Sequence, residues 1–138
     1  MLGIAPAVSG VNVPEGRRKR ILLAEDDAAI AALLTKVLGR DYDLVHASDG
    51  QKAVSLAAQQ SQLDLLLLDV MMPALDGHSV AAQVRALPNM KNVPIIFLTA
   101  KSGPADVIRG IQSGARHYIQ KPFKIEDVVA KVKKTIGD

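Results

Sequence analysis

Acidic, hydroxyl and amine side chains stand at the ends of four short apolar runs in this sequence. They are Glu25, Asp26 and Asp27 after Ile21–Ala24, Asp69 near the end of Leu63–Val70, Thr99 after Pro94–Leu98, and Lys121 after His117–Gln120. Clustered carboxylates repel one another, and a hard divalent cation such as Mg²⁺ relieves this repulsion because it prefers carboxylate oxygens. These side chains therefore suit metal-assisted phosphoryl chemistry, provided that the fold brings them together.

Each of these groups has both a chemical and an ordinary structural explanation. Asp69 could be metal ligand and nucleophile at once, because carboxylates can form aspartyl phosphates. The Lys121 ammonium would offset the charge of an incoming phosphoryl group, and the Thr99 hydroxyl would donate to one of its oxygens. Taken singly, Asp27 could be only a helix N-cap, Asp69 a turn residue, and Lys121 a solvated charge. Their coincidence at four run ends favours the chemical explanation.

The apolar runs alternate with helical patterns, and this alternation predicts the frame that positions these side chains. Strands are predicted at Ile21–Ala24, Tyr42–Ala47, Leu63–Val70, Pro94–Leu98 and His117–Gln120. Helical spacing of apolar residues predicts helices over residues 30–38, 50–59, 80–84, 107–111 and 125–136. The order favours an α/β fold, a (βα)5 doubly wound five-stranded parallel sheet with helices on both faces. Sites in such sheets lie at the carboxyl ends of the strands, where the side chains above stand.

Composition limits the other kinds of site. The 138 residues suffice for one domain, whose core must be aliphatic because only 3% of residues are aromatic. The lack of cysteine excludes disulfides, thiolate metal sites and a cysteine nucleophile. No apolar stretch reaches the ~18 residues of a membrane span. We therefore expect a cytoplasmic location and no membrane insertion. The net charge is +3, but the basic residues are not interleaved with aromatic residues and the sequence has no zinc-ligand spacing. We therefore do not expect nucleic-acid binding.

Four segments, in this order and at these intervals, resemble the receiver domains of two-component response regulators. They are ILLAEDD (Ile21–Asp27), LLLLDVMMPALDG (Leu65–Gly77), IIFLTA (Ile95–Ala100) and GARHYIQKPF (Gly114–Phe123). The resemblance covers about Arg20 to Ile136 and implies a flavodoxin- or CheY-like fold. Accordingly we expect residues 1–18 to be a flexible leader and residues 19–138 to be the receiver domain.

The resemblance also implies roles for the acidic residues. Asp69 resembles the phosphoacceptor, and Glu25 and Asp26 resemble the acidic pair that helps to hold Mg²⁺. Asp27 falls just after that pair and is less suited to be a ligand. The backbone carbonyl of Met71 resembles the third protein ligand of the metal, and the Met71 side chain would flank the path of an attacking water.

Further positions carry the switch that the resemblance implies. Thr99 resembles the switch hydroxyl, Tyr118 the switch aromatic, and Lys121 the lysine that pairs with the phosphoryl group. The Lys121–Pro122 peptide bond is expected to be cis, and Lys101 would flank the path of water with Met71. Phosphorylation would then move Thr99, let Tyr118 turn inward, and change the surface of the fourth helix, fifth strand and fifth helix.

The implied partners are a histidine kinase or histidine phosphotransfer protein as donor, and a downstream target protein. The chain is then not an enzyme, beyond self-phosphorylation from small donors and autodephosphorylation. The sequence favours a stand-alone receiver and leaves open a receiver fragment of a longer regulator and a weak homodimer. A phosphatase of the haloacid dehalogenase type is the rival, but it needs a second aspartate where Met71 stands.

Overall fold

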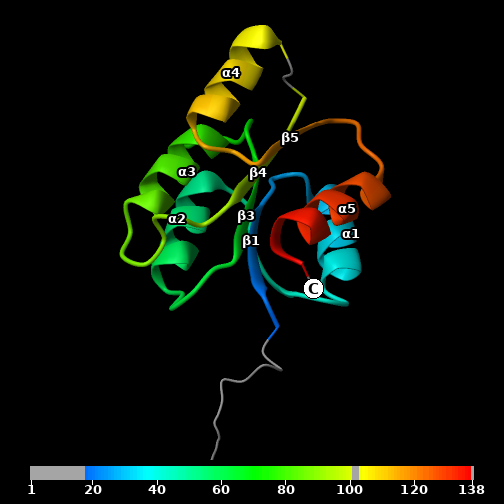
Figure 1. Ribbon diagram of the computed structural model, residues 1–138, viewed down its shortest axis with the longest axis horizontal. Helices are drawn as coiled ribbons and strands as arrows, with labels where there is room; N and C mark the ends of the chain where they lie inside the picture. The colour runs from blue at the N-terminus through cyan, green and yellow to red at the C-terminus, as the bar shows by residue number, and fades with distance from the viewer. Residues whose placement is uncertain (1–17, 101–102, 138) are drawn as a thin grey trace, which may run out of the picture.

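The computed structural model describes residues 18–100 and 103–137, and Figure 1 shows their arrangement. Residues 1–17 of the predicted leader and Lys101 lie outside this range. Within it, strands and helices alternate in the order β1 (Arg20–Ala24), α1 (Ala28–Leu38), β2 (Asp43–Ala47), α2 (Gly50–Ala58), β3 (Leu65–Asp69), α3 (Gly77–Arg85), β4 (Ile95–Thr99), α4 (Pro104–Gln112), β5 (His117–Gln120) and α5 (Ile125–Ile136).

The strands form one sheet of order β2-β1-β3-β4-β5, in which every neighbouring pair is parallel. This confirms the predicted five-stranded (βα)5 sheet. The order changes direction between β1 and β3, and ligands of open α/β sheets bind outside the carboxyl ends of the strands at such a point. The pairing of Ala24 with Leu68 brings the residues just beyond, Glu25 and Asp69, to this same edge.

Helices cover both faces of the sheet, as predicted. In Figure 1, α1 and α5 lie on one side and α2 and α3 on the other, with α4 at the top of the view. Every residue of the central strands β3 and β4 is buried. Continuous apolar runs such as Leu65–Leu68 suit strands buried on both faces, because both sets of alternating side chains then enter a core.

Three elements begin at residues other than those predicted, and side-chain hydrogen bonds account for the differences. Tyr42 precedes β2 instead of opening it, and its hydroxyl donates to the Gly137 carbonyl at 2.6 Å. Asp64 precedes β3, where its carboxylate accepts from the Arg20 amide at 2.7 Å. The third helix begins earlier than predicted, at Gly77, because the Asp76 carboxylate caps it by accepting from the Ser79 amide at 2.9 Å.

Two adjacent leucines of α1 offer a matched test of the core. Leu34 is 0% exposed and packs in the core under α1 and α5, whereas Leu33 is 50% exposed. We expect Leu34→Ala to lower the free energy of unfolding by about 3 kcal/mol, from lost burial and the cavity left behind. Leu33→Ala should cost less than about 1 kcal/mol by the same reasoning. Urea unfolding followed by circular dichroism measures both, and equal losses would contradict this assignment of the buried face.

Candidate functional site

Three carboxylates gather at the carboxyl edge of the sheet. Glu25 and Asp26 follow β1, and Asp69 is the last residue of the neighbouring strand β3. One carboxylate oxygen from each lies within 4.8 Å of the others, close enough for a single cation to bind all of them. Glu25 and Asp69 are buried, whereas Asp26 is exposed. The cluster therefore has a buried floor and one acid open to solvent.

The Lys121 ammonium bridges the two buried acids. Its Nζ lies 2.7 Å from Glu25 Oε1 and 3.0 Å from Asp69 Oδ2. Lys121 comes just after β5, and its amide donates to the Thr99 carbonyl at 2.8 Å, which extends the β4–β5 pairing to the edge. The Lys121–Pro122 peptide bond is cis, which confirms that expectation. The predicted convergence of Glu25, Asp69, Thr99 and Lys121 is thus present.

Burial and charge shift the ionisation of this group. Burial raises the pKa of the Glu25 carboxyl to about 7, aided by Asp69 and opposed by the hydrogen bond from Lys121. Burial lowers the pKa of Lys121, but its hydrogen bonds to Glu25 and Asp69 outweigh burial and leave that pKa raised. Lys121 therefore stays positively charged, whereas burial favours the protonated form of Glu25 up to about pH 7.

Backbone amides fix the acids from the other side. The Asp27 amide donates to Glu25 Oε2 at 3.1 Å, and the Met71 amide donates to Asp69 Oδ1 at 3.1 Å. Gly77 lets α3 start close to this loop, because a Cβ there would lie 2.4 Å from the Asp69 carbonyl oxygen. Both buried carboxylates therefore have one oxygen held by the backbone and the other by Lys121.

Asp27 itself is a helix cap. Its Oδ1 accepts from the amides of Ala29 and Ile30 at 3.0 and 3.1 Å, at the start of α1. This confirms the structural alternative for Asp27, which is also not among the three acids that could share a cation. Met71, whose backbone carbonyl is the expected third ligand, follows Asp69 by two residues and is 50% exposed.

Thr99 and Tyr118 stand next to each other behind the acids. Thr99, at the end of β4, is fully buried, and a hydrogen bond joins its side chain to the Tyr118 side chain. Burial, with the charge of Asp106, raises the Tyr118 pKa, which this hydrogen bond opposes. The Tyr118 ring packs edge-on against Phe97 at 6.1 Å. The ring also lies against α4, since a Cβ at Gly110 would be 2.6 Å from its Cδ2.

Sequence reasoning missed one residue near the acids, His46. Its Nε2 lies 3.0 Å from the Glu25 carbonyl oxygen. No periodicity or motif in the sequence indicates this contact, because it joins a strand to a loop 21 residues away. His78 has a packing role: it is buried, and its ring centroid lies 4.6 Å from that of Phe97.

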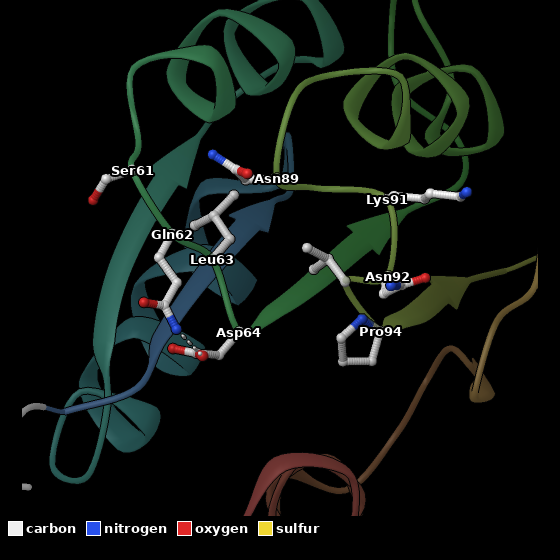
Figure 2. Close-up of a pocket in the computed structure, with 9 residues that line it drawn as sticks. Ser61, Gln62, Leu63, Asp64, Asn89, Lys91, Asn92 and Pro94 are labelled. Atoms are coloured by element: carbon white, nitrogen blue, oxygen red, sulfur yellow. Dashed lines mark hydrogen bonds between the residues drawn. The ribbon is translucent and has the colours of Figure 1, made fainter.

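The structure also has hollows apart from the acidic edge. Figure 2 shows one of about 490 Å³ formed by the loops that precede β3 and β4, at the opposite end of the strands from the acids. Its lining includes the charged residues Asp64 and Lys91 beside uncharged amides such as Gln62, which donates a hydrogen bond to Asp64 at 3.2 Å. No helix in the described part of the chain is both long and apolar enough to cross a membrane.

Comparison with known proteins gives one family. Residues 21–133 match the model of the response regulator receiver domain. The chain is 44% identical over 117 residues to the DNA-binding response regulator MtrA of Mycobacterium tuberculosis strain H37Rv, covering 84% of this chain and 50% of MtrA. The chain thus spans about half the length of the curated relatives it matches.

Solved structures agree with this match. The receiver domain of sensor histidine kinase PA1611 from Pseudomonas aeruginosa PAO1, with a magnesium ion coordinated in its active site cleft, is 34% identical with a TM-score of 0.75, over 88% of this chain and 99% of that one. Chemotaxis protein CheY4 of Vibrio cholerae is 26% identical with a TM-score of 0.78, over 86% of this chain and 98% of that one. The chain therefore belongs to the response regulator receiver domains of two-component signalling, which are phosphoacceptor signalling domains and not classical enzymes.

Proposed function

We propose that this receiver domain accepts a phosphoryl group on Asp69, with Mg²⁺ bound by the neighbouring acids, from a histidine kinase or histidine phosphotransfer protein. The observation that carries the proposal is the Lys121 ammonium held between Glu25 and Asp69 at the carboxyl edge of the sheet. The buried Asp69 carboxylate can act as the nucleophile, and the positive charge of Lys121 beside it favours the approach of an anionic phosphoryl donor.

The donor set fits Mg²⁺. Glu25, Asp26 and Asp69 offer hard carboxylate oxygens within 4.8 Å of one another, and the backbone carbonyl of Met71 completes the expected protein ligands. Burial raises the pKa of the Glu25 carboxyl to about 7, aided by Asp69, and the hydrogen bond from Lys121 only partly opposes this shift. When bound, Mg²⁺ would offset the charge of the carboxylates and the charge of the phosphoryl oxygens. The magnesium in the PA1611 receiver domain supports the same choice of metal.

The chain's own residues account for the transfer. An Asp69 carboxylate oxygen forms the new bond to phosphorus while the bond from phosphorus to the donor imidazole nitrogen breaks and the imidazole leaves. Lys121 already contacts Asp69 Oδ2 and would follow the negative charge onto the phosphoryl oxygens. The Met71 amide keeps Asp69 Oδ1 oriented. The protein thus mainly positions the groups and offsets their charge.

A donor protein has an apolar surface to bind beside the site. A hollow of about 210 Å³ adjoins Lys121 and is lined mainly by apolar side chains from α1, the loop after β5 and the first residue of α5: Ile30, Leu33, Pro122, Phe123 and Ile125. Leu33 is one of the few large apolar side chains that are half exposed in the described residues. Because this hollow continues from the acidic edge, a donor that covers it brings its phosphohistidine toward Asp69.

The switch would run from Thr99 through Tyr118 to the surface of α4, β5 and α5. A phosphoryl group on Asp69 offers Thr99 a charged acceptor in place of its hydrogen bond with Tyr118. The Tyr118 ring lies directly on Gly110, so a change in the ring position would be transmitted to α4. Ile108 and Ile111 of α4 are 54% and 68% exposed, and they would meet the downstream target.

The rival functions are less well supported. A dehalogenase-type phosphatase would need a carboxylate where Met71 stands, and steady hydrolysis of p-nitrophenyl phosphate would be its signature. The MtrA relatives are DNA-binding, but the match covers half of their length. We propose no DNA-binding role for the described residues. We assign residues 19–138 to the receiver domain and expect phosphotransfer to take place in the cytoplasm.

Phosphorylation from a small donor tests the acceptor. With acetyl phosphate and Mg²⁺, the wild type and Asp27→Asn should each gain one phosphoryl group in intact mass, because asparagine keeps the α1 cap. Asp69→Asn, and the wild type in EDTA, should gain none. A phosphoryl group on Asp69→Asn would place the acceptor elsewhere, and a gain in EDTA would remove the metal from the proposal.

The pH dependence of stability tests Glu25. Its pKa is about 7 in the folded chain against 4.5 for an unperturbed group, so between these values the folded chain holds a proton that the unfolded chain releases. The free energy of unfolding should therefore fall as pH rises through this window. Without metal, Glu25→Gln should be more stable than the wild type by ~1–2 kcal/mol at pH 8 and equal to it at pH 4.

Urea unfolding at pH 4, 6 and 8 in EDTA measures this difference. Adding Mg²⁺ at pH 8 should stabilise the wild type and leave Glu25→Gln unchanged, since a neutral amide is a poor replacement for a carboxylate ligand. Parallel pH profiles for the two proteins would show that Glu25 ionises normally.

Thr99→Val tests the switch, because valine keeps the shape of threonine and removes its hydroxyl. Beryllofluoride with Mg²⁺, a stable mimic of the phosphoryl group, should shift amide resonances of α4, β5 and α5 in the wild type. In Thr99→Val the mimic should still bind, but the shifts in these elements should fall by more than half. Undiminished shifts would mean that the signal reaches the surface without Thr99.

A further inference from the structure

The loop that carries the acids is held by the last two residues of the edge strand β2. The Glu25 amide donates to the Ala47 carbonyl at 3.1 Å, and the Glu25 carbonyl oxygen lies 3.0 Å from His46 Nε2. A carbonyl oxygen only accepts, so His46 Nε2 must carry the proton and donate. Both backbone polar groups of Glu25 are thus bound by adjacent residues of β2.

This bond reaches beyond Glu25 to Asp26. The Glu25 carbonyl and the Asp26 amide belong to one planar peptide unit. A hydrogen bond that fixes the carbonyl therefore also fixes the orientation of the Asp26 amide and the position of its Cα. On the other side of Asp26, the loop is fixed by Asp27, which caps α1 and donates its amide to Glu25 Oε2. No described residue donates a hydrogen bond to the exposed Asp26 carboxylate. The position of Asp26 therefore depends on the backbone at either side of it.

The His46 side chain is placed to make this bond. It lines a hollow beside α1 together with Ala28, Ala31, Ala32, Thr35 and Lys36. The small alanines leave room for an imidazole between β2 and α1. An aliphatic residue would fill the same space without donating.

We infer that His46 is a positioning residue for the acidic cluster: its hydrogen bond to the Glu25 carbonyl orients the Glu25–Asp26 peptide and so sets the affinity for Mg²⁺. The inference rests on the proposed function, since it assumes that Glu25, Asp26 and Asp69 bind the metal. Groups that orient metal ligands typically change affinity by about 10–100-fold when removed. Because His46 acts through the backbone, we expect the lower end, about tenfold.

The test compares replacements that differ in their ability to donate. His46→Leu and His46→Val remove the donor, and the β-branched valine suits an edge strand. His46→Gln keeps an N–H donor of similar reach. His117→Leu makes the same change on the opposite edge strand, β5, away from the Glu25 carbonyl, and is the matched control. Thermal unfolding in EDTA should be similar for the three His46 variants and the wild type, because His46 is exposed, and His117→Leu should remain folded, because His117 is only partly buried.

Isothermal titration with Mg²⁺ at pH 8 is the first measurement. The Leu and Val variants should bind Mg²⁺ about tenfold more weakly than the wild type. The Gln variant should stay within about threefold of the wild type, and His117→Leu within about twofold. The inference would be overturned if the Leu and Val variants bound Mg²⁺ as tightly as the wild type. It would also be overturned if the Gln variant bound Mg²⁺ as weakly as the Leu and Val variants.

Amide hydrogen exchange in EDTA is the second measurement, and it needs no metal. Exchange of the Glu25 and Asp26 amides should be faster in the Leu and Val variants than in the wild type and the Gln variant. Unchanged exchange would contradict the role of His46 in orienting this peptide. If the wild type itself fails to bind Mg²⁺, the proposed metal site fails. A wild type that binds beside unaffected variants overturns only the assignment of His46.

Discussion

The contact of one ammonium with two buried carboxylates is the interaction on which the rest of the site depends. Lys121 lies 2.7 Å from Glu25 Oε1 and 3.0 Å from Asp69 Oδ2, on the edge where three separate parts of the chain meet. Burying either acid without the lysine would leave an unpaired charge away from water, which is costly. Once Glu25 is ionised, above about pH 7, the lysine and the acids together leave excess negative charge, and Asp26 adds to it from the solvent side. Lys121 thus offsets the cost of burying the acids in the folded chain, and the carboxylates can still bind a further cation.

The parallel sheet is what makes this contact possible. Glu25 and Asp69 come from neighbouring central strands, whereas Lys121 follows β5, which is separated from β3 by β4. Its ammonium reaches Asp69 because its backbone continues the pairing with Thr99 past the end of the strands. The register is specified at the strand end, because a slip that drew Asp69 into the apolar core would bury its charge away from Lys121. The packing of the aliphatic core and the geometry of the charges therefore depend on each other.

What the sequence could predict follows from the same physics. Periodicity marked the strands, and the rule that sites lie at strand ends then selected Glu25, Asp69, Thr99 and Lys121 without any coordinates. The sequence could not show that Glu25 is buried while its neighbour Asp26 is exposed, because this depends on the path of a loop. The contact of His46 with the loop depends on one imidazole finding space beside alanines. Likewise, only the capping contacts of Asp27 distinguish it from the two acids before it.

The link from the acids to the surface is short because it runs along one strand pair. Leu98 pairs with Asp69, so Thr99 stands one residue beyond the acceptor on β4, and Phe97 pairs with Tyr118 on β5. The Tyr118 hydroxyl is hydrogen-bonded to Thr99, and the Tyr118 ring lies on the α4 backbone at Gly110, where no Cβ stands between them. A side chain at position 110 would separate the ring from α4. In the proposed switch, Gly110 therefore lets a small displacement of Thr99 reach a whole helix, because packed interiors leave little free volume to absorb it.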